Sequence, residues 1–412
     1  MHSYLDHILE SFYAATNWNV DNQYANLTAS SRELLDFSLP SGFILNVSAL
    51  SSPASASSYS VKNLSGIVDG AISYFYCAPN NLLSSNRLST DDVDLTKVLC
   101  GYRPLKTLES PEDPKYREVW LGGKRVDAKN TLLYGKLYLP SNTLEAMYIR
   151  QMSPTDQIVI SAVSDARLRN GGTMMTQLQK NTGKWCSEFI YSTDEALLGL
   201  RGLYNFGYDS KLSDPSSQSF LSAGGEIYYG VFNKAAGVST GLRYTTSSAY
   251  VNTPMTMTVT LNPIMGQLSA TYAVKSTTNT TFASRLDFNA FSYESDLTLG
   301  CELWKRSPVN STASEADLAD RIPQQSQASI LSHEYLQTTQ TEGATKTKDP
   351  EPIKRTFVDE AVWKARVSTS SPTIRLLWEG RIKAFLFSFG TEIDVRPGQG
   401  VKTFGLELQY AS

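Results

Sequence analysis

The segment whose residue types and spacing most suggest catalysis is Gly237-Val-Ser-Thr-Gly241, which matches the G-x-S-x-G pattern of serine hydrolases. In those enzymes a sharp strand-to-helix turn exposes the serine, and a histidine elsewhere acts as its base. Here apolar and polar residues alternate straight through the segment, and the only later histidine, His333, lies in a polar stretch without periodicity. We therefore interpret Ser239 as a strand residue and predict no catalytic site.

The residues that commonly bind metals are scattered along the chain without the spacing of a ligand set. They are three histidines and four cysteines: His2, His7, His333, Cys77, Cys100, Cys186 and Cys301. No glycine-rich phosphate loop is present. We expect free thiols in a reduced chain, no metal or other cofactor, and no enzymatic activity.

The composition is typical of a strand-rich chain. Tyrosine occurs 22 times in 412 residues and aromatic residues make up 11%, and aromatic and β-branched residues favour strands. Lys and Arg number 37 against 40 Asp and Glu, a net charge of -3, so the charge balance predicts no nucleic-acid partner.

The sequence predicts neither a transmembrane helix nor a cleaved leader. No stretch approaches the run of about 18 apolar residues that a transmembrane helix needs. The first residues lack a basic and an apolar region, and they include Asp6 and Glu10, whereas transit peptides are poor in acids. We expect the chain to stay unprocessed and to start from the cytosol.

Helical and strand periodicities divide the chain near Gly42. Residues 4–13 place their apolar side chains on one face of a helix, and Ser3 with Asp6 resembles a capping box. Residues 17–41 are polar and irregular. From Gly42 to Tyr410 we count about nineteen segments in which apolar residues alternate with Ser, Thr, Gly, Asn or charged residues. Most have the length that a tilted strand needs to cross a bilayer.

This meander of strands favours a closed barrel in a membrane over a soluble β-sandwich. So many strands in an open sheet would leave unpaired edges, and in hydrocarbon only a closed ladder satisfies every backbone group. Aromatic residues near segment ends also suit the membrane interface. They are Tyr244, Tyr250, Phe282, Trp304, Trp363, Trp378 and Tyr410. The fold class is therefore all-β, a transmembrane antiparallel barrel of about 19 strands.

A barrel of this size has a polar lumen. With an odd strand number, the first and last strands must close side by side in parallel. If, in addition, both termini lie on the same side, the segment before the first strand must cross the lumen, and we expect the N-terminal helix there. Inward positions carry both charge signs: Arg243, Lys275, Asp296, Glu302, Glu392, Asp394 and Glu407. This mixture favours no strong ion selectivity, but a porin-like channel for small metabolites remains an alternative.

We expect two regions: residues 1–41, an amphipathic helix and polar segment, and residues 42–412, the barrel. Two stretches interrupt the strands, at about 79–118 and 305–356. Both are polar, and the second has few aromatic residues and no lasting period. We predict long loops there, the second mostly disordered.

The last predicted strand ends in Thr403-Phe-Gly-Leu-Glu-Leu-Gln-Tyr410. This resembles the β-signal read by the mitochondrial sorting machinery, with Thr403, Gly405, Leu408 and Tyr410 at its defining positions. Other segments extend the resemblance to the fungal mitochondrial distribution and morphology barrel proteins: residues 14–19, 24–29, 34–38, 68–76, 292–296 and 300–304. Together with the length and the two polar insertions, the resemblance covers nearly the whole chain.

The resemblance implies a nineteen-stranded barrel similar to the voltage-dependent anion channel. It implies a scaffold of the mitochondrial outer membrane, located at contact sites with the endoplasmic reticulum (ER). The implied partners are other subunits of the ER–mitochondria encounter structure, which supports phospholipid exchange and mitochondrial morphology, and subunits of the sorting and assembly machinery. The small subunit of the import translocase and membrane lipid are further implied partners. In the assembly machinery, such a barrel assists biogenesis of outer-membrane barrels such as the general import pore.

The resemblance also implies partner-binding residues. The Ser-Tyr-x-Tyr segment that the family associates with its tether partners matches Ser73-Tyr74-Phe75-Tyr76. An aromatic pair associated with the assembly machinery matches Phe291 and Tyr293. Position in the sequence leaves a second interpretation open for both pairs, in which these rings are ordinary lipid-facing residues.

Overall fold

The computed structural model of the chain describes residues 3–64, 66–78, 95–99, 101–106, 108, 119–121, 124–126, 130–168, 170–206, 220–246, 253–308, 357–396, 398 and 400–411. Two compact units are present, Met1–Lys305 with Ala361–Ser412, and Arg306–Glu360. The first unit contains nearly all of the barrel wall and the segments inside it. Among the described residues, no helix is both long and apolar enough to cross a membrane.

Nineteen strands form one sheet. They are β1 (Gly42–Ser52), β2 (Ser55–Leu64), β3 (Ile67–Ala78), β6 (Thr131–Leu139), β7 (Thr143–Gln151), β8 (Asp156–Ser164), β9 (Gly172–Asn181), β10 (Trp185–Ser192), β11 (Leu197–Phe206), β12 (Phe220–Gly230), β13 (Ala236–Thr245), β14 (Met255–Asn262), β15 (Gln267–Lys275), β16 (Thr280–Asn289), β17 (Ser295–Pro308), β18 (Phe357–Ser368), β19 (Thr373–Ile382), β20 (Phe385–Asp394) and β21 (Val401–Ala411). The short strands β4 (Val119–Leu121) and β5 (Lys124–Val126) pair only with each other.

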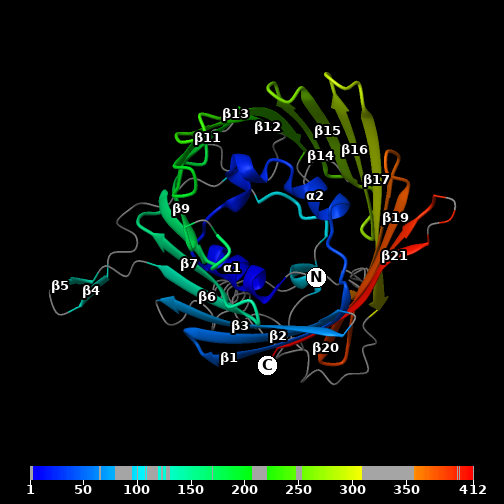
Figure 1. Cartoon of the computed structure of the whole chain (residues 1–412), viewed down its shortest axis with the longest axis horizontal. Helices are drawn as coiled ribbons and strands as arrows, with labels where there is room; N and C mark the ends of the chain where they lie inside the picture. Colours follow the sequence, from blue (N-terminus) through cyan, green and yellow to red (C-terminus); the bar gives the residue numbers. More distant parts are fainter. Residues whose placement is uncertain are drawn as a thin grey trace, which may run out of the picture. The chain divides into compact units, whose positions relative to one another are not determined.

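Each strand of the large sheet pairs with the next along the chain, and β1 closes the ring by pairing in parallel with β21 (Figure 1). The parallel register runs from Gly42 opposite Gly405 to Ser48 opposite Ala411. The predicted strand number and the parallel closure are confirmed. An odd number of strands forces this closure, because only an even number lets the last strand meet the first in antiparallel orientation.

Side chains alternate between the outer surface and the lumen, as the strand period of two requires. Along β3, Ile72, Tyr74 and Tyr76 are exposed on the outside, whereas Phe75 and Cys77 are buried on the inside. The predicted orientations of the alternating segments are therefore confirmed here. Three of the cysteines lie in the described chain, and all three are free thiols.

The prediction that Trp304 belongs to an outer aromatic girdle is wrong. Its neighbour Leu303 is exposed on the outside, so Trp304 faces the lumen, where its indole Nε1–H donates to Glu302. In contrast, Trp363 and Trp378 do face outward and pack together, with ring centroids 6.1 Å apart. Tyr250 lies outside the described residues.

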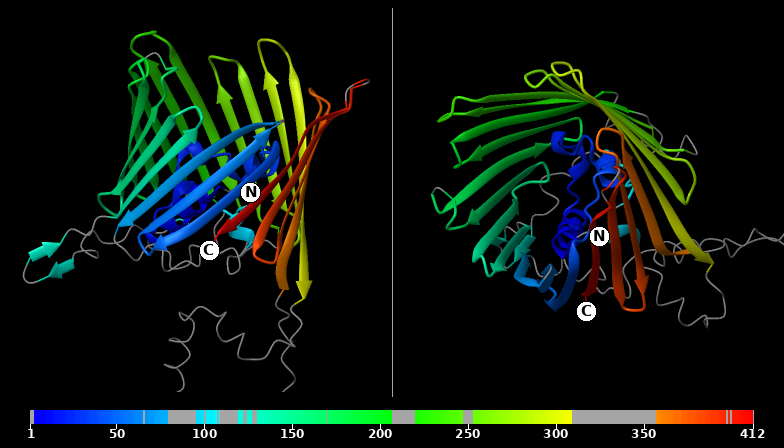
Figure 2. Two further views of the ribbon diagram at one scale, coloured as in Figure 1. Left: turned by 60° about the horizontal axis from the view of Figure 1, so that its bottom comes forward. Right: turned by 45° about the vertical axis from the view of Figure 1, so that its right-hand side comes forward.

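The N-terminal segment lies inside the ring of strands, as predicted (Figures 1 and 2). It consists of helix α1 (Tyr4–Ala15), the 3₁₀ turns η1 (Val20–Asn22) and η2 (Tyr24–Asn26), and helix α2 (Ala29–Leu35). The capping box at the start of α1 is present, because the Ser3 hydroxyl accepts from the Asp6 N–H and the Asp6 carboxylate accepts from the Ser3 N–H. This cap satisfies two backbone donors that a helix start leaves unpaired.

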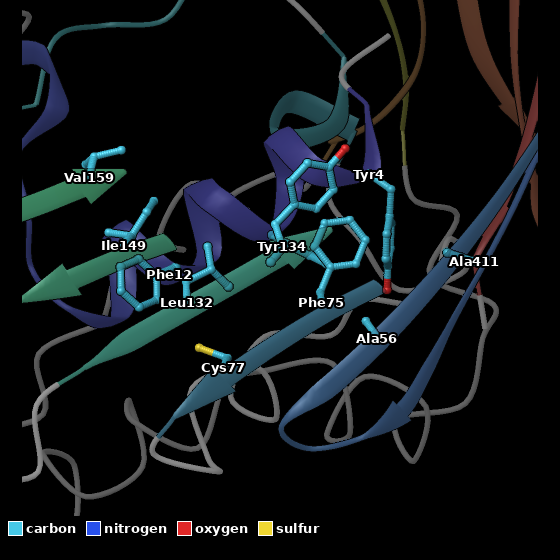
Figure 3. Packing of buried hydrophobic residues seen from close by; sticks show 11 residues of the cluster. Tyr4, Phe12, Ala56, Phe75, Cys77, Leu132, Tyr134, Ile149, Val159 and Ala411 are labelled. Atoms are coloured by element: carbon cyan, nitrogen blue, oxygen red, sulfur yellow. The ribbon is translucent and has the colours of Figure 1, made fainter. Parts of the chain in front are cut away.

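The apolar face of α1 packs against the inner wall of the first strands (Figure 3). Ile8 and Phe12 of the helix are fully buried in one cluster with Phe75, Leu132 and Ile149 of β3, β6 and β7. The core of the molecule is therefore the contact between helix and wall. Burying the side chain of a residue such as Ile8 or Phe12 contributes roughly 1.5–3 kcal/mol.

The two ends of the barrel differ in their connections. At the end where β1 begins, every connection is short, and the longest is residues 165–171 between β8 and β9. We call this the short-turn end. The long connections, residues 79–130, 207–219, 246–254 and 309–356, all fall at the opposite end, which we call the long-loop end.

The two predicted loops, at about 79–118 and 305–356, lie mostly outside the described residues. Within the first, Leu95–Val98 forms the short helix α3, whose Leu95 and Val98 pack against Val362 and Leu386 of the inner wall. At the start of the second, β17 continues to Pro308.

Candidate functional site

Polar contacts fasten the N-terminal segment to the lumen wall. The Asn22 amide donates to Asn181 Oδ1 at 2.7 Å and accepts from Asn205 at 2.7 Å, and all three side chains are buried. The Tyr24 and Ser239 hydroxyls lie 2.5 Å apart. Further along the segment, the Asp36 carboxylate accepts from Arg285 at 2.6 and 3.1 Å. The buried asparagine pairs in particular fix one arrangement of the segment.

Arg243 holds the middle of this segment. Its guanidinium is 2% exposed and donates from Nη1 to the backbone carbonyls of Asp21, at 3.1 Å, and Asn26, at 3.4 Å. The sequence placed Arg243 in the lumen correctly. Its hydrogen-bond partners lie in residues 21–26, whereas α1 packs against β3, β6 and β7.

A second segment, residues 101–106, joins the first inside the barrel. Arg103 forms an ion pair with Asp21, and the Lys106 N–H donates to the same carboxylate at 3.0 Å. The Tyr102 N–H donates to the buried Glu302 of β17 at 3.0 Å. These residues belong to a stretch whose charges predicted a polar loop. We call residues 3–41 and 101–106 together the plug.

Replacing Arg243 with Met is expected to loosen residues 20–27 from the wall. Two hydrogen bonds from a charged donor are lost, so local opening should become easier by about 2–3 kcal/mol. That corresponds to opening about 30- to 150-fold more often. Chymotrypsin cleavage after Tyr24 or Leu27 in the refolded barrel measures it. Arg375→Met is the control, since Arg375 pairs with Glu392 on the neighbouring strand, and equal cleavage of both variants would contradict the role of Arg243.

Tyr74 and Tyr76 stand on the outer surface of β3, 55% and 39% exposed. Tyr74 lies between Ser57 of β2 and Gly135 of β6, and a methyl group added at Gly135 would meet no atom within 4 Å. The Tyr74 ring therefore projects beyond small neighbours, and β3 carries both rings towards the long-loop end. We call this pair the wall tyrosines.

Phe291 and Tyr293 do not lie on a strand. They occupy the turn between β16 and β17 at the short-turn end, where they are 70% and 80% exposed. The turn is well defined, because Asn289 Oδ1 accepts from the backbone N–H groups of Phe291, at 2.9 Å, and Ser292, at 3.2 Å. Tyr293 adopts a left-handed backbone conformation with φ of 58°. The structure brings these two residues together, away from the wall tyrosines.

The neighbouring β14–β15 hairpin adds two exposed apolar residues, Ile264 and Met265, that the sequence did not predict as part of this surface. Asn262 builds the same kind of turn between β14 and β15, and that turn exposes Ile264 and Met265. The Phe291 ring lies over Gly266, where an added methyl group would come within 2.8 Å of it. We call these exposed residues and their two turns the apolar turn tips. Turns are usually polar, so the apolar residues in the Pro-Ile-Met-Gly sequence between two strands were the feature that could have indicated an exposed apolar surface.

The β-signal residues divide between the two faces of β21. Leu408 and Tyr410 point outward, opposite Leu45 and Val47 of β1, and the Tyr410 ring packs against Phe385 at 5.4 Å. Thr403 and Gly405 point inward. The inner face of Gly405 lies directly beneath the Pro40 backbone, where the chain leaves the lumen to enter β1.

The G-x-S-x-G segment lies within the continuous strand β13. Ser239 faces the lumen and is hydrogen bonded to Tyr24. The segment therefore has neither the sharp turn nor the exposed serine that a nucleophile elbow requires. His333 is outside the described residues.

Comparisons with known proteins agree on one family. The family model described as Mitochondrial distribution and morphology protein 10 matches residues 1–412. Similar curated proteins, all named Mitochondrial distribution and morphology protein 10, include one from Sclerotinia sclerotiorum, 44% identical over 428 residues, and one from Phaeosphaeria nodorum, 42% identical over 427 residues. Another, from Yarrowia lipolytica, is 40% identical over 412 residues. In all three, the alignment covers 100% of both chains.

Proposed function

Because the chain belongs to the Mitochondrial distribution and morphology protein 10 family, we propose that it is a non-enzymatic scaffold in the mitochondrial outer membrane. The family name supports a role in the distribution and morphology of mitochondria. In our proposal the barrel joins the ER–mitochondria encounter structure, where phospholipid exchange occurs, and it also joins the sorting and assembly machinery. There it assists insertion of other outer-membrane barrels, such as the general import pore.

The outer surface supports the membrane location. Large apolar side chains are exposed along it, such as Leu200, Val259 and Leu299. Exposed apolar surface of this extent is unfavourable in water but suits hydrocarbon. Among the described strands, the nineteen of the large sheet close into a ring without a free sheet edge, as hydrocarbon demands.

The observation that carries the scaffold proposal is the separation of two aromatic surfaces. The wall tyrosines lie on the outer wall of β3, and the apolar turn tips lie at the short-turn end, on β14–β17. Exposed aromatic residues are common anchors of protein interfaces. Two surfaces so placed can bind two partners independently. We assign the wall tyrosines to the tether subunits and Phe291 with Tyr293 to the assembly machinery.

Paired alanine substitutions test the assignment. We expect Tyr74→Ala with Tyr76→Ala to lower co-purification of tether subunits at least about tenfold, because removing an interface anchor commonly costs about 2 kcal/mol or more. Recovery of assembly subunits should remain. Phe291→Ala with Tyr293→Ala should give the opposite pattern. The measurement is a mild-detergent pull-down from mitochondria, quantified by mass spectrometry.

Matched controls remove an outward pair of strand tyrosines and an exposed apolar turn residue elsewhere on the barrel. Tyr191→Ala with Tyr229→Ala removes outward tyrosines of β10 and β12, and Leu168→Ala removes an exposed apolar residue from another short turn. These should leave both partner sets bound. Loss of both partner sets with either test pair would contradict two separate surfaces, and unchanged recovery with both test pairs would contradict the scaffold assignment.

The channel alternative finds less support, because inward residues of both charge signs, such as Arg243 and Glu302, favour no strong ion selectivity. Planar-bilayer recordings distinguish the two. We expect a small, poorly selective conductance from the intact barrel, whereas a large and selective conductance would favour a channel for small metabolites.

A further inference from the structure

The outer wall carries a hollow of about 300 Å³ across β8, β9, β10 and β11. Its apolar lining comes from one cross-strand row of outward side chains, Ile158, Leu178, Phe189 and Leu200. The next row towards the long-loop end consists of Asp156, Lys180, Ser187 and Gly202. The hollow is thus mainly apolar, and its charged groups lie on the side nearer the long-loop end.

Small residues create the hollow. Ser187 lies opposite Gly202, and a methyl group added at Gly202 would meet no atom within 4 Å. On the far side of this row, Trp185 and Tyr204 face each other and project outward. Ser187 and Gly202 therefore leave a shallow strip on the wall. Phe189 and Leu200 border it on one side, and Trp185 and Tyr204 border it on the other.

The charges beside the hollow are mostly positive. Lys180 is exposed in the same cross-strand row as Ser187 and Gly202. Lys184 follows in the β9–β10 turn, with its Nζ 5.8 Å from the Tyr204 ring centroid. Arg150 extends the apolar row beyond Ile158. Two carboxylates are also present: Asp156, whose Oδ2 accepts from the Ser153 and Thr155 hydroxyls at 2.7 and 3.1 Å, and Glu188, which forms an ion pair with Arg201 at 3.4 Å. Since both carboxylates are engaged, Lys180, Lys184 and Arg150 leave a net positive charge that attracts an anion.

We propose that this hollow binds a phospholipid with a net negative headgroup. Its acyl chain lies against Ile158, Leu178, Phe189 and Leu200, and Lys180 with Lys184 bind the phosphate. Trp185 and Tyr204 are of the kinds that concentrate at the membrane–water interface, where a headgroup would be. This inference rests on the proposed membrane location but not on the proposed protein partners.

Lipid titration of the purified, folded barrel tests the proposal. The barrel is held in an uncharged maltoside detergent, and binding of phosphatidylglycerol and of phosphatidylcholine with identical chains is measured by native mass spectrometry. We expect phosphatidylglycerol to bind more tightly. Lys180→Gln should weaken phosphatidylglycerol binding about fivefold and leave phosphatidylcholine unchanged, whereas Gly202→Leu should weaken both by filling the hollow.

The controls are Gly135→Leu, another outward glycine with open space, and Lys383→Gln, an exposed lysine in another turn at the same end. Heat-modifiable migration on gels verifies folding, and Ser187→Leu replaces Gly202→Leu if the latter does not fold. Equal binding of the two lipids by the wild-type barrel, or unchanged binding with the hollow filled, would overturn the proposal.

Two further results separate this inference from the scaffold proposal. If the wild-type barrel retains its protein partners but shows no lipid preference, only the lipid site fails. If Gly202→Leu loses a membrane protein from a mitochondrial pull-down yet binds phosphatidylglycerol normally, the hollow binds a transmembrane helix and the lipid proposal is wrong.

Discussion

A single methyl group added at Gly405 is expected to destabilise the closed barrel strongly. Gly405 lies in β21 between Gly390 of β20 and Gly42 of β1. Its added Cβ would lie 2.3 Å from the Pro40 carbonyl oxygen and 2.9 Å from the Gly42 carbonyl oxygen. Both are backbone atoms at the point where the chain passes from the lumen into the wall, so neither can yield without opening the parallel seam.

The expected cost of Gly405→Ala is about 3 kcal/mol or more, at or above the upper range for overpacking, because the obstructing atoms are backbone. Refolding into detergent micelles followed by urea unfolding measures it. No sorting machinery is present in this assay, so a defect reports packing and not recognition of the β-signal. Gly135→Ala is the control, since its added methyl group has open space. Equal unfolding midpoints for the two variants would contradict the packing role.

Replacing Lys364 with Met should destabilise the barrel by about 3–5 kcal/mol. Lys364 Nζ of β18 lies 2.7 Å from Glu379 Oε2 of β19, and both side chains are 0% exposed. The substitution removes the lysine from a buried carboxylate. Breaking a buried ion pair by removing one partner is among the larger single penalties a fold can carry.

The double variant Lys364→Met with Glu379→Leu should recover most of that loss, because it removes both charges. The control is Arg375→Met, whose partner Glu392 is buried but whose own side chain is 33% exposed. That pair should contribute about 1 kcal/mol or less. Urea unfolding of the four proteins is the measurement. If the double variant is no more stable than Lys364→Met, the buried pair is not the cause.

The barrel was predictable because strand alternation depends only on local residue order. The period of two assigns Tyr74 outward and Arg243 inward without any knowledge of neighbours. Strand number and closure then follow from counting and from the need to pair every edge. Trp304 shows the limit of this reasoning: aromatic residues at strand ends suit the membrane interface, but the register of Leu303 places Trp304 in the lumen.

Contacts inside the lumen were not predictable, because they join residues far apart in the sequence. Arg103 and Lys106 have the composition of a solvated loop, yet both meet the Asp21 carboxylate. The local sequence does not distinguish a charged side chain that faces solvent from one that pairs with a residue about 80 positions away. Ile264 and Met265 were not predicted for a related reason, since the strand periodicity carries no information about side chains in turns.

Site-specific photocrosslinking in intact mitochondria tests the central claim most directly. A photoreactive residue is placed at position 74 on the outer wall or at position 293 in the short turn, one position per chain. We predict adducts with tether subunits from position 74 and with assembly-machinery subunits from position 293. The same adducts from both positions, or lipid adducts alone from both, would contradict a barrel that binds two sets of partners through separate surfaces.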